Sequence, residues 1–156
     1  IYLNFNLVNM IKITQNRSGC PISSSLEIIG DTWSLLIIRD LFLQRTTFSD
    51  FMNSPEKISS NILTNRLKKL LRFNLIQFYR DPKDKKVKKY FLTSAGIDLY
   101  PFIYDLSIWS KKHLDIEYNN IALDWFNENF DKTSSQTIED DIITYENFKE
   151  SALKYI

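Results

Sequence analysis

Residues 58–93, ISSNILTNRLKKLLRFNLIQFYRDPKDKKVKKYFLT, decide the fold of this chain. Leucines recur in the first part of the segment at the spacing of one helix face, and Asn, Thr, Lys and Arg occupy the opposite face. The leucines are Leu63, Leu67, Leu70 and Leu71. Ser59 or Ser60 can cap the start of the helix, and Asn74 stands where a helix ends in a left-handed residue. The pattern predicts an amphipathic helix with a polar, cationic outer face.

The residues after this helix predict a β-hairpin. Residues 75–80 and 86–92 are β-prone runs. Residues 81–85 join them and begin with Asp-Pro, which favours a turn. Because lysines crowd this turn and the strand that follows it, we expect the tip of the hairpin to be strongly basic.

Three helices are expected before residue 58. The first begins after Cys20 and stops at Gly30, and Asp31 or Thr32 caps the second. This second helix, residues 33–43, is so rich in Leu and Ile that it must be buried on most sides. A third, short helix is indicated by the capping arrangement of Thr47 and Asp50 and ends near residues 53–55.

The remainder of the chain is also helical by pattern. One long helix is expected from residue 94 to about 114, with Thr93 as its cap and Pro101 as a kink, and its apolar arc is wider than one domain needs. Two further helices, 119–130 and 138–155, are separated by a polar stretch.

This order of elements predicts a mainly α fold with a small β-hairpin wing, a winged helix-turn-helix domain with a C-terminal helical extension. We divide the chain into an N-terminal arm, 1–19, a winged helix-turn-helix domain with dimerisation helices, 20–114, and an acidic helical extension, 115–156. Met10 followed by Ile-Lys-Ile is typical of a bacterial start, so residues 1–9 are interpreted as vector-derived or upstream-translated sequence.

The formal net charge of +1 conceals a strong asymmetry. Residues 1–114 hold 17 Lys and Arg against 9 Asp and Glu, a net charge of +8, and residues 115–156 hold 3 against 10, a net charge of −7. Residues 57–89 alone carry 11 basic side chains and only two acidic ones. Such a distribution favours a body that faces a polyanion and carries an acidic tail.

A helix fits the major groove of DNA, where Asn, Ser and Thr on its first two turns can reach base edges. Lysines and arginines further along the helix and on the hairpin would meet phosphates or the minor groove. The candidate DNA-binding residues are Ser59, Ser60, Asn61, Thr64, Asn65, Arg66, Lys68, Lys69, Arg80, Lys83, Lys85, Lys86 and Lys88. Double-stranded DNA is therefore the expected partner.

Three separated blocks resemble the HxlR family of winged helix-turn-helix transcriptional regulators. The blocks are Cys20-Pro21 with Leu26-Glu27-Ile28-Ile29-Gly30-x-x-Trp33-x-Leu35-Leu36-Ile37-Ile38-Arg39-x-Leu41, then Ile58-Ser59-x-x-x-Leu63-Thr64-x-Arg66-Leu67-x-x-Leu70, and Tyr90-x-Leu92-Thr93-x-x-Gly96. The resemblance runs over roughly residues 20–112. It implies a dimeric bacterial repressor or activator that often answers to electrophiles, oxidants or other small signals.

Two departures from the family pattern stand out. Asp31-Thr32 replaces a Gly-Lys pair before Trp33, and Asn74 replaces a glycine after the recognition helix. We expect neither departure to touch the DNA-binding face. The acidic extension after Leu114 lies outside the resemblance, so its role stays open.

The long helix 94–114 is expected to form a two-fold homodimer that binds an inverted-repeat operator. Its candidate interface residues are Leu99, Phe102, Ile103, Leu106 and Trp109. Cys20, at a helix start and in the family's cysteine position, is a candidate sensor of redox, electrophile or small-molecule signals. A small apolar residue packed against the core is the alternative interpretation of Cys20.

Other function classes find little support. One cysteine excludes an internal disulfide framework, no run is apolar enough to cross a membrane, and a cytoplasmic location is expected. His113 is the only histidine, so no zinc spacing exists, and no phosphate loop or nucleophile motif indicates an enzyme or a cofactor. A winged helix used for protein contact and a small ligand-binding enzyme remain as alternatives. Salt-insensitive binding would favour the former, and turnover the latter.

Overall fold

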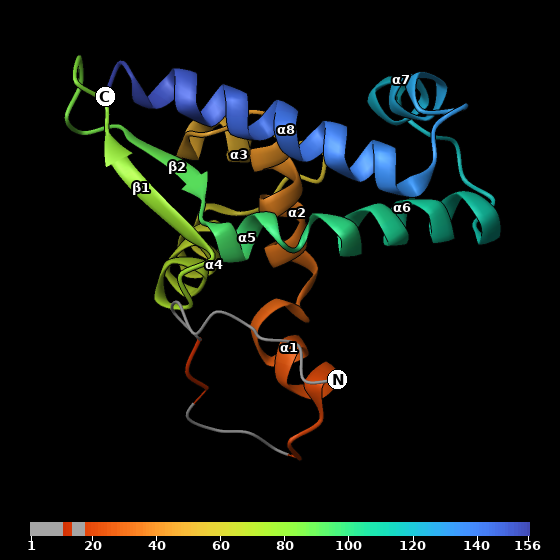
Figure 1. Ribbon diagram of the computed structural model, residues 1–156. Helices are drawn as coiled ribbons and strands as arrows, with labels where there is room; N and C mark the ends of the chain where they lie inside the picture. Colours follow the sequence, from red (N-terminus) through yellow and green to blue (C-terminus); the bar gives the residue numbers. More distant parts are fainter. Residues whose placement is uncertain (1–10, 14–17) are drawn as a thin grey trace, which may run out of the picture.

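The computed structural model describes residues 11–13 and 18–156. Helices dominate this part of the chain, and a two-stranded antiparallel hairpin projects from one side (Figure 1). The elements are α1 (Pro21–Ile29), α2 (Thr32–Phe42), α3 (Phe48–Met52), α4 (Ser60–Arg72), β1 (Ile76–Arg80), β2 (Lys88–Leu92), α5 (Ser94–Ile97), α6 (Tyr100–His113), α7 (Asn120–Glu128) and α8 (Ser134–Leu153). The mainly helical winged helix-turn-helix fold expected from the sequence is confirmed. None of the described helices is both long and apolar enough to cross a membrane.

Side-chain caps start the helices of the helix-turn-helix. Asp31 accepts hydrogen bonds from the backbone N–H groups of Trp33 and Ser34 and caps α2. Thr47 forms a reciprocal capping box with Asp50 at α3, and Ser59 caps α4. Asn74 ends α4 with a φ of 52°, as its identity predicted.

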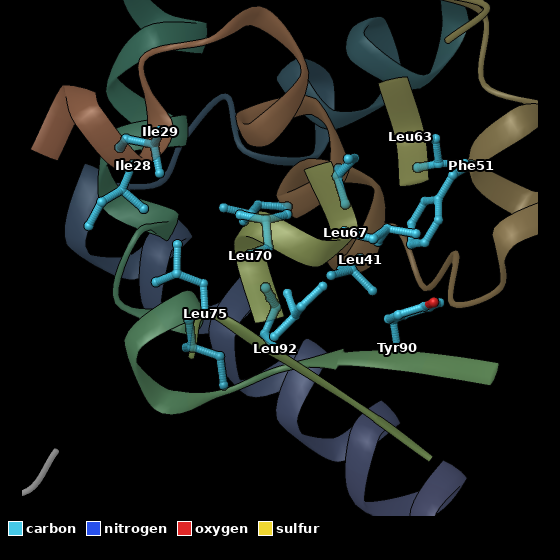
Figure 2. Packing of buried hydrophobic residues seen from close by; sticks show 14 of the residues in the cluster. Ile28, Ile29, Leu41, Phe51, Leu63, Leu67, Leu70, Leu75, Tyr90 and Leu92 are labelled. Carbon is cyan, nitrogen blue, oxygen red and sulfur yellow. The ribbon is translucent and has the colours of Figure 1, made fainter. Parts of the chain in front are cut away.

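The core lies where α2, α3 and α4 meet the hairpin (Figure 2). Leu41, Leu63, Leu70 and Leu92 have no exposed surface, and Phe51 is almost completely buried. The hairpin contributes the end of β2, where Leu92 pairs with Ile76 across the two strands. Since apolar side chains from all these elements share one cluster, the position of the hairpin relative to α4 is fixed by packing.

The long helix expected over residues 94–114 is instead two helices, α5 and α6. Pro101 has no N–H to donate, and its ring would clash with the preceding turn of a continuous helix. It lies in the first turn of α6, where the missing N–H costs nothing. Pro101 therefore starts a new helix and does not kink an existing one.

Two other boundaries also differ from the sequence-based prediction. β2 begins at Lys88 and not at residue 86, because Asp84 accepts hydrogen bonds from the backbone N–H groups of Lys86 and Val87 and keeps them in the turn. α8 begins at Ser134, inside the stretch interpreted as a polar connection. Thr133 caps it there in a capping box with Gln136.

The acidic extension packs onto the rest of the molecule. α8 runs beside α6 and crosses the end of the hairpin (Figure 1). Tyr145 of α8 is 1% exposed, and its Oη accepts a hydrogen bond of 2.7 Å from the backbone N–H of Leu92. The Nζ of Lys149 donates to the Leu92 carbonyl at 2.6 Å. Burial raises the pKa of Tyr145 to about 12, so its hydroxyl remains protonated. Both backbone groups of Leu92 are thus held by α8.

Candidate DNA-binding surface

The first two turns of α4 present short polar side chains to solvent. Ser59, Ser60, Asn61 and Asn65 are exposed, and Thr64 is half-buried. The opposite face of the helix carries the buried leucines of the core, so the polar side chains cannot turn inward. Hydrogen-bonding groups of this kind, fixed on a packed helix, are suited to contact base edges.

The cations of α4 fall into two groups. Lys68 is exposed and forms no salt bridge within the described part of the chain. Arg66 and Lys69 both bind Asp31, at 2.7 Å from Arg66 Nε to Oδ1 and 3.1 Å from Lys69 Nζ to Oδ2. Burial raises the pKa of Asp31, but hydrogen bonds from Ser34 and Lys69 and the charge of Arg66 outweigh that effect and hold the pKa at about 2.

Asp31 therefore touches the proposed DNA-binding face, contrary to the expectation from sequence. It caps α2 and at the same time binds two cations of α4, which are 35 and 38 residues away in the chain. Sequence reasoning missed this role. The available signal was the acidic residue itself, at a position where the family pattern has glycine.

The hairpin carries a second group of cations. Lys83, Lys85 and Lys86 are exposed, and none of them forms a salt bridge to another described residue. We call Lys68 and these three lysines the basic face. Hydrogen bonds within the turn fix its shape, because Asp81 Oδ1 accepts from the Lys83 N–H at 2.7 Å and Arg80 Nη1 donates to the Lys85 carbonyl at 2.7 Å.

The strand side chains near this turn are partly engaged. Lys88 Nζ lies 4.3 Å from the centre of the Phe78 ring, a cation–π contact. Lys89 binds Asp81 at 2.7 Å and lowers the pKa of that carboxyl group. Lys88 is thus held along the strand, whereas the turn lysines are free to face a ligand.

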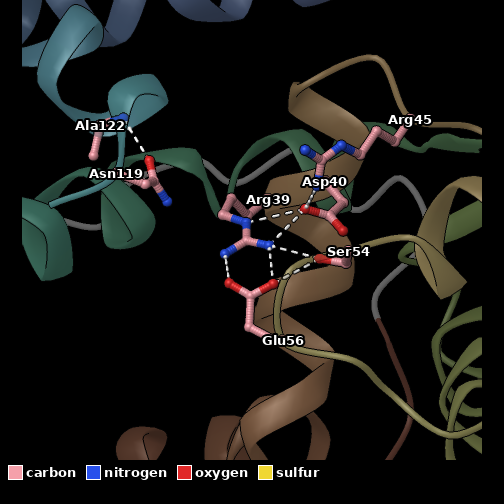
Figure 3. Close-up of polar contacts among 7 residues, drawn as sticks. All are labelled: Arg39, Asp40, Arg45, Ser54, Glu56, Asn119 and Ala122. Atoms are coloured by element: carbon pink, nitrogen blue, oxygen red, sulfur yellow. Dashed lines mark hydrogen bonds and ion pairs between the residues drawn. The ribbon is translucent and has the colours of Figure 1, made fainter.

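An ion-pair network holds the helices that support α4 (Figure 3). Arg39 of α2 binds Glu56 with Nη1 to Oε1 at 2.6 Å, and it also binds Asp40 at 2.7 Å. Asp40, which is 3% exposed, pairs with Arg45 as well. The hydrogen bond from Arg39 holds the pKa of Glu56 at about 2. The network ties the segment after α3 to α2 and so fixes the approach of the chain to α4.

The candidate dimer residues fall into two groups, one packed against the core and one exposed. Leu99 is the residue before α6, and the other four lie on α6. Leu99 and Ile103 pack against the core cluster. Phe102, Leu106 and Trp109 are exposed by 42%, 43% and 55%, and their spacing of four and three residues places them on one helix face.

Two further sequence-based predictions concern single sites. Cys20 is exposed at the residue before α1, and its side chain makes no capping hydrogen bond. Within residues 11–13 and 18–156, no group of three His, Cys, Asp or Glu side chains is arranged to hold a metal ion.

Comparisons with known proteins agree with this geometry. The model of the HxlR-like helix-turn-helix family matches residues 28–118. The uncharacterized HTH-type transcriptional regulator YdeP of Bacillus subtilis (strain 168) is 31% identical over 99 residues, which are 62% of this chain and 76% of YdeP.

Solved structures give the same result. The crystal structure of PA1607 superimposes with a TM-score of 0.59 at 29% identity, over 67% of this chain and 72% of that one. The reduced form of the transcriptional regulator YodB from B. subtilis superimposes with a TM-score of 0.52 at 26% identity, over 62% of this chain and 95% of YodB. Since the family model covers more than half of the sequence, the chain belongs to the HxlR-like helix-turn-helix family, which consists of transcriptional regulators and not of enzymes.

Proposed function

We propose that this regulator is a homodimer that binds an inverted-repeat DNA operator, with α4 in the major groove. The observation that carries the proposal is the exposed polar start of α4 beside the unpaired lysines of the basic face. Phosphate contacts from lysines would supply affinity, and hydrogen bonds from α4 would supply sequence preference.

Individual residues take distinct roles in this proposal. Asn61 and Asn65 can each offer a donor and an acceptor to a base edge, and Thr64 can add a hydroxyl or a methyl contact. Ser59 is committed to the cap of α4, since its Oγ accepts from the Ile62 N–H. Lys83, Lys85 and Lys86 would reach the backbone beside the groove.

Arg66 and Lys69 differ from the other proposed phosphate contacts because Asp31 already binds them. A phosphate would have to share them with Asp31 or displace it. We propose that their first role is to position α4 against α2, and that Lys68 is the cation of α4 most available to DNA.

The proposed dimer uses the exposed stripe of Phe102, Leu106 and Trp109 on α6. Covering such a contiguous apolar stripe removes apolar surface from water and lowers the free energy of the protein. A two-fold axis through this stripe would present two copies of α4, and half-sites one or two turns apart, about 34 Å per turn, would then lie on one side of the duplex.

The signal that the regulator answers to is proposed to be an oxidant, an electrophile or another small molecule. An exposed thiol at Cys20 supports the first two, and the similar regulator YodB has a structure described as its reduced form. Because its proposed partner is chromosomal DNA, we propose the bacterial cytoplasm as its place of action.

The experiment is selection of bound genomic fragments followed by fluorescence anisotropy on the selected site and on random duplex. Asn65→Ala should reduce the preference for the selected site by about 1 to 3 kcal/mol, whereas Lys86→Ala should weaken both duplexes alike. Lys154→Ala, an exposed lysine at the end of α8, is the matched control and should change neither. Equal, weak binding of both duplexes in low salt would contradict the proposal.

A further inference from the structure

A cavity of about 260 Å³ lies between α2, α6, α7 and α8. Five aromatic side chains line it. They are Phe42 of α2, Tyr100 and Tyr104 of α6, and Trp125 and Phe126 of α7. The rings contact one another, with 5.8 Å between the centres of Tyr104 and Trp125 and 4.5 Å between those of Phe42 and Tyr100. α7 and α8 follow residue 118, where the family match ends, so the acidic extension contributes seven of the seventeen residues that line this cavity.

One carboxylate, Asp141 of α8, lines the cavity among these rings. Its Oδ2 accepts a hydrogen bond from the Trp125 Nε1–H at 2.9 Å and another from the Tyr100 hydroxyl. Burial and the nearby Asp141 raise the pKa of Tyr100, so the phenol stays protonated and donates its hydrogen bond. The two donors fix the orientation of the carboxylate.

No cation forms a salt bridge with Asp141 in the part of the chain that the structure describes, and Lys132 interacts with it only through longer-range charge. The neighbouring Asp140 takes the Lys132 ammonium, at 2.7 Å. The other charges on the cavity wall, Arg39, Arg45 and Glu56, are neutralised in the network around Asp40. Asp141 is therefore the carboxylate of the wall that has no salt bridge.

Aromatic faces attract cations, and a carboxylate in a partly desolvated site gains most from a ligand of opposite charge. An anion would be repelled by Asp141, and a neutral apolar molecule would cover the carboxylate without pairing it. Phe126 already attracts a cation, since Lys111 Nζ lies 4.3 Å from its ring centre. Lys111 itself does not line the cavity.

We propose that this cavity binds a small organic ammonium cation with an apolar or aromatic body. The ammonium group would lie against Asp141, and the apolar body would lie among the rings of Tyr104, Trp125 and Phe126. This inference goes beyond the proposed DNA-binding function and does not depend on it, because binding to the cavity can be measured without DNA.

The test is isothermal titration calorimetry of the full chain with benzyltrimethylammonium as the probe. Two comparisons measure the contribution of charge. One is titration with benzylsulfonate, an anion of similar shape, and the other is displacement by neopentylbenzene, the neutral isostere. We expect the cation to bind at least about tenfold more tightly than either. Equal or tighter binding of the neutral or anionic compound would overturn the proposal, as would the absence of binding by the cation.

Two variants and a control locate the site. Asp141→Asn keeps an acceptor for Tyr100 and Trp125 but removes the charge, and should weaken the cation about tenfold or more. Glu139→Gln removes an exposed charge from the same helix, outside the cavity lining, and should leave binding unchanged. Ala122→Phe fills the cavity without altering its charge, and should abolish binding even if Asp141→Asn fails to fold. Undiminished binding by a folded Asp141→Asn or Ala122→Phe would place the cation elsewhere and overturn the proposal.

Discussion

The basic face and the cavity between α2, α6, α7 and α8 both carry charges that form no salt bridge in the described structure. The charges are of opposite sign, and their surroundings differ. The lysines of the basic face are exposed, and water and salt ions screen them. Asp141 is half-buried among rings, where screening is weak. Paired charges such as Arg39 and Glu56 hold segments of the fold together. Both proposals place a ligand at charges that have no salt bridge, and in both the sign of those charges predicts the opposite sign for the ligand.

The largest expected effect on DNA binding comes from breaking the proposed dimer, because each subunit would contact one half-site. α6 borders the cavity on one face and carries the exposed apolar stripe on another. Leu106→Asp puts a charge in the middle of that stripe and should dissociate the homodimer. Loss of one half-site contact should then weaken operator binding about a hundredfold or more. Sedimentation velocity and anisotropy measure the two effects. Lys112→Asp, an exposed change of charge on the same helix, is the control, and a monomeric wild type would refute the premise.

Removal of the hairpin lysines should have the next largest effect on DNA binding and no effect on binding of the cation to the cavity. Each phosphate contact contributes about 0.9 to the slope of log affinity against log salt, so Lys83, Lys85 and Lys86 all changed to Ala should lower the slope by about 2.7. Titrations from low to high salt on the selected operator give the slope. An unchanged slope would exclude these lysines from the interface, and unchanged binding of benzyltrimethylammonium would show that the two regions are independent.

Asp31→Asn should sharpen the comparison by adding cations to the basic face. Asparagine caps helices about as well as aspartate, so α2 keeps its cap while Arg66 and Lys69 lose their anion. The salt slope should steepen by up to about 1.8, and affinity for random duplex should rise a few-fold. A slope equal to that of the wild type would mean that Arg66 and Lys69 do not reach phosphates even when released.

The same variant has a distinct pH dependence of stability. The pKa of Asp31 falls from 3.8 to about 2 on folding, so its contribution to stability is complete above pH 3.8 and is lost as the pH falls toward 2. Urea unfolding at a series of pH values should show this acid loss in the wild type and a smaller loss in Asp31→Asn. Identical acid profiles for the two proteins would argue against the ion pairs with Arg66 and Lys69.

The smallest effect is expected at Cys20, which lies in neither region. Cys20→Ser should leave operator affinity unchanged under reducing conditions, because the side chain is exposed and makes no cap. If Cys20 is a sensor, diamide should alter DNA binding by the wild type and not by the serine variant. The same response from both proteins would remove Cys20 from any signalling role.

Local patterns in the sequence predicted the elements that present the basic face. The caps of α2, α3 and α4, the left-handed Asn74 and the turn after β1 all depend on residues a few positions apart, so spacing and residue type were sufficient. The order of these elements indicated a winged helix-turn-helix, and the family resemblance gave independent support for that fold. The identity of each DNA contact remains a prediction.

The rest depended on contacts between distant residues, which one sequence does not reveal. Asp31 binds residues 35 and 38 positions away, and Tyr145 binds Leu92 across 53 positions. The extension, interpreted from its charge as an acidic appendage, gained its place from Tyr145 and the neighbouring apolar residues. Asp141 was not distinguishable from the other acidic residues of α8 until the fold brought Trp125 and Tyr100 to it.

The bonds from α8 to Leu92 also bear on how the molecule avoids aggregation. A two-stranded hairpin leaves donors and acceptors on the outer edge of each strand, ready to pair with a strand of another molecule. In the second half of β2 three of these groups are taken, because the Tyr90 N–H donates to the Thr46 carbonyl and α8 satisfies both groups of Leu92. α8 and Thr46 thus cover this part of the edge in place of a third strand, which leaves fewer groups of β2 for a strand of another molecule to pair with.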